Sequence, residues 1–244
     1  MIKPIHAIII GDEILSGKRK DKHLGYLSEK LTSNGLSLLK AEFVADDLNI
    51  IADTIKSKLN CIVFCFGGIG ATPDDCTRQA AANAHKRKMV RNQDALKLIV
   101  NQFGKDAYPK RVLMSDLPEN VNLIPNSINN IPGFFLNEHY FMPGFPEMSW
   151  PMIDWILTSR YAEELNSQIL DISVWINDVP ESKLIDLMND VVRTNPEIKI
   201  YSLPKLGSRI KVELGVRGDI LNAKRAIEQI KKGLTALNYE WYEK

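Results

Sequence analysis

The sequence predicts an α/β fold in which a three-layer, mostly parallel sheet is followed by a second, small α+β domain. Three observations support this prediction. Apolar runs alternate with amphipathic helical segments over the first two-thirds of the 244 residues, a glycine-rich loop joins one of these runs to a helix, and the rhythm of the elements changes near residue 164. We therefore expect two domains, at residues 1–164 and 165–244.

The elements of the first domain follow from hydrophobic spacing and from helix stop signals. Strands are expected at 5–10, 36–44, 61–66, 133–136 and 139–142, and helices at 21–34, from 47 onward, after the glycine loop, at 93–103 and at 149–161. Ile51, Ile55 and Leu59 give the second helix an apolar face. The proline-rich stretch 108–130 is expected to be a loop-rich excursion. Because strands alternate with helices, ligands are expected at the carboxyl ends of parallel strands.

The second domain is predicted to be a β-α-β-β-α module. Its strands are expected at 169–176, 198–203 and 209–216, and its helices start near a capping box at 178–181 and at Asp219. This order resembles the KH arrangement, but the Gly-x-x-Gly clamp of an RNA-binding KH domain is lacking, so nucleic acid is not the expected partner. A module of this size is expected to pack on the first domain or on a partner subunit.

The composition is that of an ordinary globular protein, with 45% hydrophobic and 25% charged residues. Because 31 Lys and Arg residues stand against 30 Asp and Glu residues, no global basic field exists, and a small-molecule partner is favoured over nucleic acid. The apolar stretch at 1–10 is too short for a signal segment and no cleavage site follows it. We expect a cytoplasmic protein with no membrane partner.

The three cysteines and four histidines predict neither a disulfide nor a zinc site. Cys61 and Cys65 lie four residues apart on one predicted strand, which is too far for a disulfide, so buried reduced thiols are expected. The histidines show no metal-ligand spacing.

The most informative stretch is the uncharged run 61–66 with the glycine loop that follows it. Gly67, Gly68 and Gly70 allow the backbone to turn its amides outward, and the next helix adds the positive end of its dipole. A phosphate or pyrophosphate is therefore expected at this loop. Asp74 and Asp75 follow directly, and they either hold a divalent cation that bridges to the phosphate or cap the helix.

Acidic residues follow three of the predicted parallel strands. They are Asp12 with Glu13, Asp46 with Asp47, and Asp74 with Asp75. Asp12, Asp46 and Asp75 are our candidates for holding Mg²⁺ or another divalent cation, or for positioning a water in phosphoanhydride cleavage. The alternative is that each of them caps the helix that follows it.

Two further features keep alternative interpretations. The hydroxyls of Thr72 and Thr77 either contact a ligand or serve the helix start. Lys18, Arg19, Lys20 and Lys22 form either a solvated surface or a clamp on a second phosphate, and Ser16 is near enough in sequence to approach a ligand.

Four motifs together resemble the MoaB/Mog-like molybdopterin-binding domain family. They are Gly67-Gly68-Ile69-Gly70, the first loop at 11–17, Val44-Ala45-Asp46-Asp47, and the Pro-Gly-x-Pro loop at 143–146. Within that family the sequence is most similar to the amino-terminal part of the CinA (competence and damage-inducible) type, without the carboxyl-terminal amidase domain. One departure is Ile69, which stands where a threonine is usual in molybdenum-cofactor members.

The resemblance implies metal-dependent hydrolysis of a nucleotide pyrophosphate such as ADP-ribose. Its alternatives are non-catalytic binding of molybdopterin or a related phosphate ligand, and a role in molybdenum-cofactor biosynthesis; a homodimer or homotrimer is implied as well. Carried onto this chain, Asp12, Asp46 and Asp75 are catalytic and metal-binding. The ligand-binding residues are Gly11, Ser16, Gly67, Gly68, Gly70, Thr72, Asp74, Thr77, Pro143 and Gly144.

Overall fold

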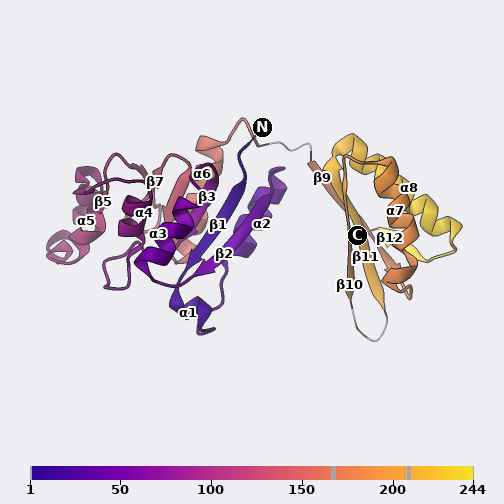
Figure 1. Ribbon diagram of the computed structural model, residues 1–244, viewed down its shortest axis with the longest axis horizontal. Coiled ribbons are helices and arrows are strands. Elements are labelled where there is room, and N and C mark those ends of the chain that lie inside the picture. The colour runs from indigo at the N-terminus through magenta and orange to yellow at the C-terminus, as the bar shows by residue number, and fades with distance from the viewer. Residues whose placement is uncertain (1, 166–168, 206, 208–209, 244) are drawn as a thin grey trace. The chain divides into compact units, whose positions relative to one another are not determined.

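The structure is a computed structural model that describes residues 2–165, 169–205, 207 and 210–243. It divides into two compact units, Met1–Leu165 and Asn166–Lys244, one residue from the boundary expected above. Helices and strands alternate in the first unit, and the second has an antiparallel sheet (Figure 1).

The first unit is built on a six-stranded sheet in the order β2-β1-β3-β8-β7-β6. The four strands β2, β1, β3 and β8 are mutually parallel, and β7 and β6 are antiparallel to their neighbours. Their bounds are β1 Ile5–Ile10, β2 Leu38–Val44, β3 Ile62–Phe66, β6 Asn122–Ile124, β7 Gly133–Leu136 and β8 His139–Met142.

Helices cover both faces of this sheet, so the unit has three layers. Helices α2 (His23–Ser33) and α6 (Pro146–Arg160) pack on one face together with Ala7 and Ile9 of β1. Helices α3 (Leu48–Lys56), α4 (Thr77–Ala84) and α5 (Gln93–Phe103) bring residues to the other face together with Ile8 and Ile10. Strand β1 is therefore buried on both sides, which is why its sequence is an unbroken apolar run. The predicted fold class is confirmed.

The remaining elements of the first unit are short. They are α1 (Asp12–Leu15), β4 (Met89–Arg91), β5 (Asp116–Pro118) and the 3₁₀ helices η1 (Gly104–Ala107) and η2 (Arg111–Ser115). Strands β4 and β5 pair with each other in a separate two-stranded sheet. The excursion expected at 108–130 thus contains two short strands, β5 and β6, and part of a small side structure around η2.

Several predicted boundaries are wrong, each for a local reason. The helix after the glycine loop begins at Thr77 because Asp75 closes a tight turn with Thr72 before it. Helix α3 ends at Lys56, so Leu59 lies beyond it and is exposed. Helix α6 begins at Pro146, since proline is well suited to the first helical turn.

The cysteines are free, as expected. Cys65 is buried as predicted, whereas Cys61, which was also expected to be buried, is half-buried like Cys76. Complete burial raises the pKa of the Cys65 thiol, which keeps it in its neutral form. In the described part of the chain, no helix combines the length and the apolar character needed to span a bilayer.

A hydrogen-bonded pair of histidines, His85 and His139, lies near the amino-terminal end of β8. His139 of β8 donates from Nε2 to the carbonyl of Lys58 (3.0 Å), since a carbonyl only accepts. Its Nδ1 must then accept from Nε2 of His85, 3.1 Å away. Protonation of His139 would break this arrangement, and burial together with His85 lowers its pKa to about 4.

The second unit is a four-stranded antiparallel sheet, β10-β11-β9-β12, with two helices on one face. The bounds are β9 Ile169–Asn177, α7 Ile185–Thr194, β10 Lys199–Lys205, β11 Lys211–Asp219, α8 Ile220–Ala236 and β12 Trp241–Glu243, with η3 at Glu181–Lys183. The last strand was not expected, because a three-residue segment becomes a strand only by pairing with β9. Residues 204 and 205, which lie between two expected strands, belong to β10, and residue 209, where the next expected strand starts, lies outside the described residues.

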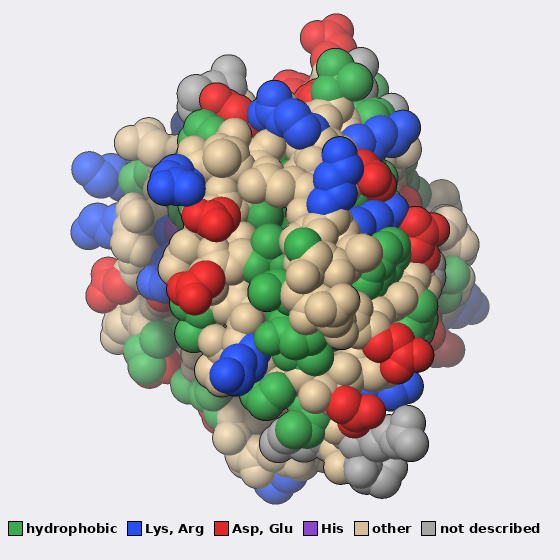
Figure 2. Space-filling view, turned by 90° about the vertical axis from the view of Figure 1, so that its right-hand side faces the viewer, with side chains coloured by type: hydrophobic (Ala, Val, Ile, Leu, Met, Phe, Trp, Pro, Cys, Tyr) green, Lys and Arg blue, Asp and Glu red, His purple; other side chains and the backbone are tan. Residues whose placement is uncertain are grey.

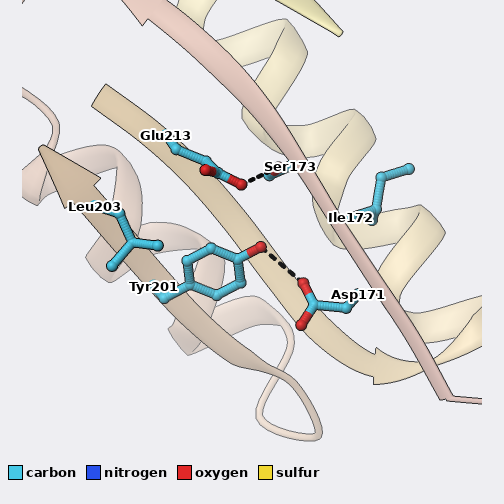
Figure 3. A pocket seen from close by; sticks show the side chains of 6 residues that line it. All are labelled: Asp171, Ile172, Ser173, Tyr201, Leu203 and Glu213. Atoms are coloured by element: carbon cyan, nitrogen blue, oxygen red, sulfur yellow. Dashed lines mark hydrogen bonds between the residues drawn. The ribbon is translucent and has the colours of Figure 1, made fainter. Parts of the chain in front are cut away.

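The helix-bearing side of the second unit mixes hydrophobic and charged side chains (Figure 2), with Ile185 of α7 and Leu221 of α8 among the exposed ones. On the other face of the sheet, Tyr201 donates to Asp171 and Ser173 donates to Glu213, each at 2.7 Å, beside a pocket of about 610 Å³ (Figure 3). The Tyr201 ring lies across Gly215, where a β-carbon would come within less than 3.0 Å of it.

We expect Gly25→Ala to stabilise the first unit by roughly 0.5 to 1 kcal/mol. Gly25 is an exposed position of α2, and a β-carbon there would meet no atom within 4 Å. Alanine then restricts the unfolded chain without any clash in the folded one. Urea denaturation measures the change.

The matched substitution is Gly233→Ala in α8, where the β-carbon would lie within less than 3.0 Å of Leu187. Displacement of Leu187 offsets the helical gain there, so no stabilisation is expected. Equal effects at the two positions would contradict this explanation.

Candidate functional site

A pocket of about 400 Å³ lies at the carboxyl ends of four neighbouring parallel strands. Each of β1, β2, β3 and β8 leads into a loop that contributes to its wall. The lining residues are Ile10, Gly11, Glu13, Arg19, Asp46, Gly67, Gly68, Ile69, Gly70, Ala71, Thr72, Asp74, Asp75, Met114, Asn129, Ile131, Pro143, Gly144, Phe145 and Met148. Segments far apart in the sequence therefore meet at the edge where α/β sheets bind ligands.

The glycine loop after β3 requires glycine at two successive positions. Gly67 and Gly68 have φ values of 106° and 65°, which L side chains rarely adopt. A β-carbon on Gly67 would lie within less than 3.0 Å of the Ile10 carbonyl, and one on Gly144 would be 3.4 Å from the α-carbon of Gly67. Because Gly67 and Gly144 have no side chains, the backbones of the loops after β1, β3 and β8 come into close contact.

Four consecutive backbone amides of the loop are without an acceptor in the described part of the chain. The amide of Gly67 donates to the Met142 carbonyl (3.0 Å) and that of Thr72 donates to Asp75 (2.8 Å). Between them, the amides of residues 68–71 donate to no acceptor in the described part of the chain. All four residues line the pocket. Such a run of free donors is suited to an anion.

Thr77 lies directly behind the loop at the start of α4. Its amide donates to the Gly68 carbonyl (3.0 Å), and its side chain is completely buried. The Thr77 hydroxyl oxygen has no hydrogen-bond partner in the described residues, although Gly68 packs against it. The Cys76 N-cap provides no side-chain hydrogen bond to α4 either, so the first helical turn keeps donors available.

The carboxylates of the predicted metal site separate into a pair and a single residue. Asp12 and Asp46 lie together, because the amide of Asp12 donates to Asp46 (2.9 Å) and the amide of Asp46 donates to Asp12 (3.4 Å). Asp75 instead accepts from both the amide and the hydroxyl of Thr72, which closes its own turn. The helix cap of α3 is Asp47, which accepts from Asn49 and Ile50.

The pair is held in a negative environment. Burial raises the pKa of Asp46, and the neighbouring charges of Asp12, Glu13 and Asp74 raise it further. The pKa of the exposed Asp74 is lowered, because the neighbouring Thr72 side chain favours its charged form. Glu13, Asp46, Asp74 and Asp75 all line the pocket, so it carries four carboxylates together with the free amides.

The geometry does not fit a cage of three carboxylates around one metal ion. Within residues 2–165 and the other described ranges, no three His, Cys, Asp or Glu side chains are placed so that they hold a metal ion. One contributing feature is Asp75, whose Oδ2 accepts both hydrogen bonds of the Thr72 turn. The prediction that Asp12, Asp46 and Asp75 bind a metal together therefore lacks geometric support.

Most of the other predicted ligand residues line the pocket, and a few do not. Gly11, Gly67, Gly68, Gly70, Thr72, Asp74, Pro143 and Gly144 line the pocket, whereas Asp12, Ser16 and Thr77 do not. From the basic run, Arg19 reaches the pocket; its guanidinium pairs with Glu13 (3.4 Å) and lies 5.8 Å from the Phe145 ring centre. Lys20 and Lys22 line a smaller neighbouring pocket.

Sequence reasoning missed the apolar wall of the pocket. Met114, Ile131, Phe145 and Met148 line it together with Asn129, which donates toward the Met148 sulfur (3.5 Å). Met114 and Ile131 come from the excursion before β7, where no local pattern marks a ligand-facing residue. Phe145 lies inside the Pro-Gly-x-Pro motif and Met148 two residues after it, so this motif was the one available signal.

Comparisons with known proteins point in one direction. Residues 6–163 match the model of a family described as a probable molybdopterin binding domain. A protein of Archaeoglobus fulgidus is 31% identical over 227 residues, which are 92% of this chain and 95% of that protein. A CinA-like protein of Desulforapulum autotrophicum is 30% identical over 211 residues, 80% of this chain and 50% of that relative, so the chain spans about half of its length.

A solved structure is also similar. The protein CinA of Thermoplasma acidophilum, described as having unknown function, aligns with a TM-score of 0.59 and 25% identity. The alignment covers 64% of this chain and 98% of that protein.

Proposed function

Since the chain belongs to the family of probable molybdopterin-binding domains, we propose that its pocket binds a small molecule through a phosphate or pyrophosphate group. The observation that carries the proposal is the run of four amides at residues 68–71 that have no acceptor in the described part of the chain. Backbone donors at a loop that enters a helix are the usual means of holding phosphate.

The apolar wall supports a ligand with a second, less polar part. Met114, Ile131 and Met148 lie in the same pocket as the glycine loop, and Asn129 adds an amide group beside them. Pockets for small molecules combine such an apolar lining with a few placed polar groups. Molybdopterin and nucleotide pyrophosphates both join a phosphate to a flat ring system and are the ligand classes that we propose.

The test is calorimetric titration of the protein with inorganic pyrophosphate and with ADP-ribose. Binding of both is expected, with ADP-ribose the tighter ligand because it also reaches the apolar wall. Titration with sulfate at the same ionic strength is the control for nonspecific anion binding. Absence of binding by either ligand would overturn the proposal.

A second candidate is metal-dependent hydrolysis of a nucleotide pyrophosphate such as ADP-ribose. The observation in its favour is the rim of four carboxylates, whose charges favour a pyrophosphate bound to a divalent cation over one without it. We propose that such a substrate arrives as its complex with a divalent cation, and that Asp46, the member of the Asp12–Asp46 pair that lines the pocket, faces that complex. Mg²⁺ commonly keeps waters and is bound through one or two carboxylates plus substrate phosphates.

This candidate predicts release of AMP from ADP-ribose in the presence of Mg²⁺ and loss of that activity with EDTA. Asp46→Asn is expected to lower the rate at least about tenfold, because it halves the charge of the pair. Asp53→Asn on the exposed side of α3 is the matched control. Binding without any AMP release would leave a non-catalytic ligand-binding protein.

A further inference from the structure

The glycine loop is fastened from behind by one arginine. Arg78, the second residue of α4, donates from one terminal nitrogen to the Gly70 carbonyl (2.7 Å). Its other terminal nitrogen donates to the carbonyls of Leu113 (2.5 Å) and Asp116 (2.8 Å). One guanidinium thus joins the phosphate loop to the segment around η2.

The two segments that Arg78 joins are the two walls of the pocket. Gly70 belongs to the wall of free amides, and Met114, which lies between the two carbonyl acceptors on the other side, belongs to the apolar wall. Arg78 itself lines a different pocket, together with Arg91 and Asp116, and is not among the residues that line the candidate site. It therefore stands behind both walls without facing the ligand.

Peptide geometry connects this fastening to the direction of a donor. In a trans peptide the carbonyl and the following amide point in opposite directions, and the bond after Gly70 is trans. With the Gly70 carbonyl held on Arg78, the amide of Ala71 points away from Arg78. Ala71 is one of the four residues whose amides are free beside the pocket.

The charge of Arg78 also lacks a carboxylate partner in its hydrogen bonds. All three of its acceptors are backbone carbonyls, and its Nε is buried with no partner in the described residues. The carboxylate of Asp116 is taken by Arg91, which pairs with it through two nitrogens. Burial accordingly lowers the pKa of Arg78, although the neighbouring Asp116 and Asp75 oppose this.

We infer that Arg78 is a positioning residue of the proposed phosphate site: its guanidinium fixes the glycine loop with its amides turned to the pocket and couples the loop to the wall that carries Met114. The inference rests on the proposed function for its ligand. Only a planar fork with several donors spans the two segments at once, so lysine is a poor substitute for it.

The test uses Arg78→Met, Arg78→Lys and the matched control Arg91→Met. Arg91 lines the same rear pocket and is bound to the same Asp116, but it makes no hydrogen bond to the loop in the described residues. Pyrophosphate affinity is measured by calorimetry, and the exchange rate of the Thr77 amide, which donates to Gly68, is measured by NMR without ligand.

Arg78→Met is expected to weaken pyrophosphate binding at least about tenfold and to accelerate Thr77 amide exchange at least about tenfold. Arg78→Lys is expected to recover part of the affinity, and it serves as the test variant if the methionine variant does not fold. Arg91→Met is expected to stay within about twofold of the wild type in both measurements. A loss of thermal stability alone, with affinity unchanged, would show a merely structural role.

Failure of the inference and failure of the proposed function are distinguishable. If the wild type binds pyrophosphate and both Arg78 variants bind it as tightly as Arg91→Met, the inference is overturned and the function stands. If the wild type binds neither pyrophosphate nor ADP-ribose, the proposed function is overturned. In that case an unchanged exchange rate of the Thr77 amide in the Arg78 variants overturns the inference as well. An accelerated rate supports the part of the inference that says that Arg78 holds the loop in place.

Discussion

Gly68→Ala is expected to weaken pyrophosphate binding by at least about a hundredfold while the protein stays folded. Gly68 has a φ of 65°, where alanine costs roughly 1–2 kcal/mol. Its β-carbon would also lie within less than 3.0 Å of the Thr77 hydroxyl oxygen and 3.2 Å from the Thr77 β-carbon, and overpacking adds about 1–3 kcal/mol. The loop relieves both by moving, which misplaces the amides at 68–71. Calorimetric titration measures the loss.

The control for backbone strain is Gly17→Ala. Gly17 has a similar φ of 73°, but a β-carbon there would meet no atom within 4 Å. It is expected to cost a comparable amount of stability without affecting ligand binding. The double variant Gly68→Ala/Thr77→Ala removes the oxygen that clashes and is expected to restore part of the affinity. If Gly68→Ala binds pyrophosphate as the wild type does, the loop is not the phosphate site.

The stability of the first unit is expected to fall by about 3 kcal/mol as the pH is lowered from 6.5 to about 4, through His139 alone. The ordinary histidine pKa of 6.5 is lowered to about 4 in the folded protein, and each pKa unit corresponds to about 1.4 kcal/mol. Between these values the unfolded chain binds more protons than the folded one, so stability falls with falling pH. Above pH 6.5 both states are neutral and the contribution is constant.

Urea denaturation at closely spaced pH values measures this dependence. His6, His23 and His85 also have lowered pKa values and add to the decline with the same sign. The variant His139→Gln isolates the contribution of His139, because glutamine keeps a donor for the Lys58 carbonyl but does not titrate. Its pH dependence is expected to be shallower than that of the wild type by the amount assigned to His139. Parallel curves for the two proteins would refute the assignment.

The elements that could be predicted from sequence are those whose causes are local. Strand β1 is predicted at its exact bounds because both of its faces are buried, which leaves an uninterrupted apolar run. Helix α5 is predicted at its observed bounds, and its ends have local causes in the structure, because Asn92 caps it and Gly104 follows it. The family resemblance read from four loop motifs is confirmed by the family match over residues 6–163.

The elements that could not be predicted depend on partners distant in sequence. Strand β12 exists through its pairing with β9, and the apolar wall forms because Met114 is brought to the glycine loop. The convergence of Asp12 with Asp46 followed from parallel strand order, whereas the turn in which Asp75 binds Thr72 competes with the helix start by side-chain hydrogen bonding. The spacing of residues in the sequence does not indicate whether Asp75 forms this turn or caps the helix.

The arrangement of the four parallel strand ends has a consequence for synthesis of the chain. Gly11 and Asp46 emerge early from the ribosome, the glycine loop follows, and Pro143 and Gly144 arrive only after β8, which pairs directly with β3. A nascent chain that stops before β8 lacks both the neighbour of β3 and the acceptor for the Gly67 amide. If the proposed binding is correct, ligand affinity reports completed assembly of the first unit, and truncations that end before β8 are expected to lack it while those that end after α6 have it.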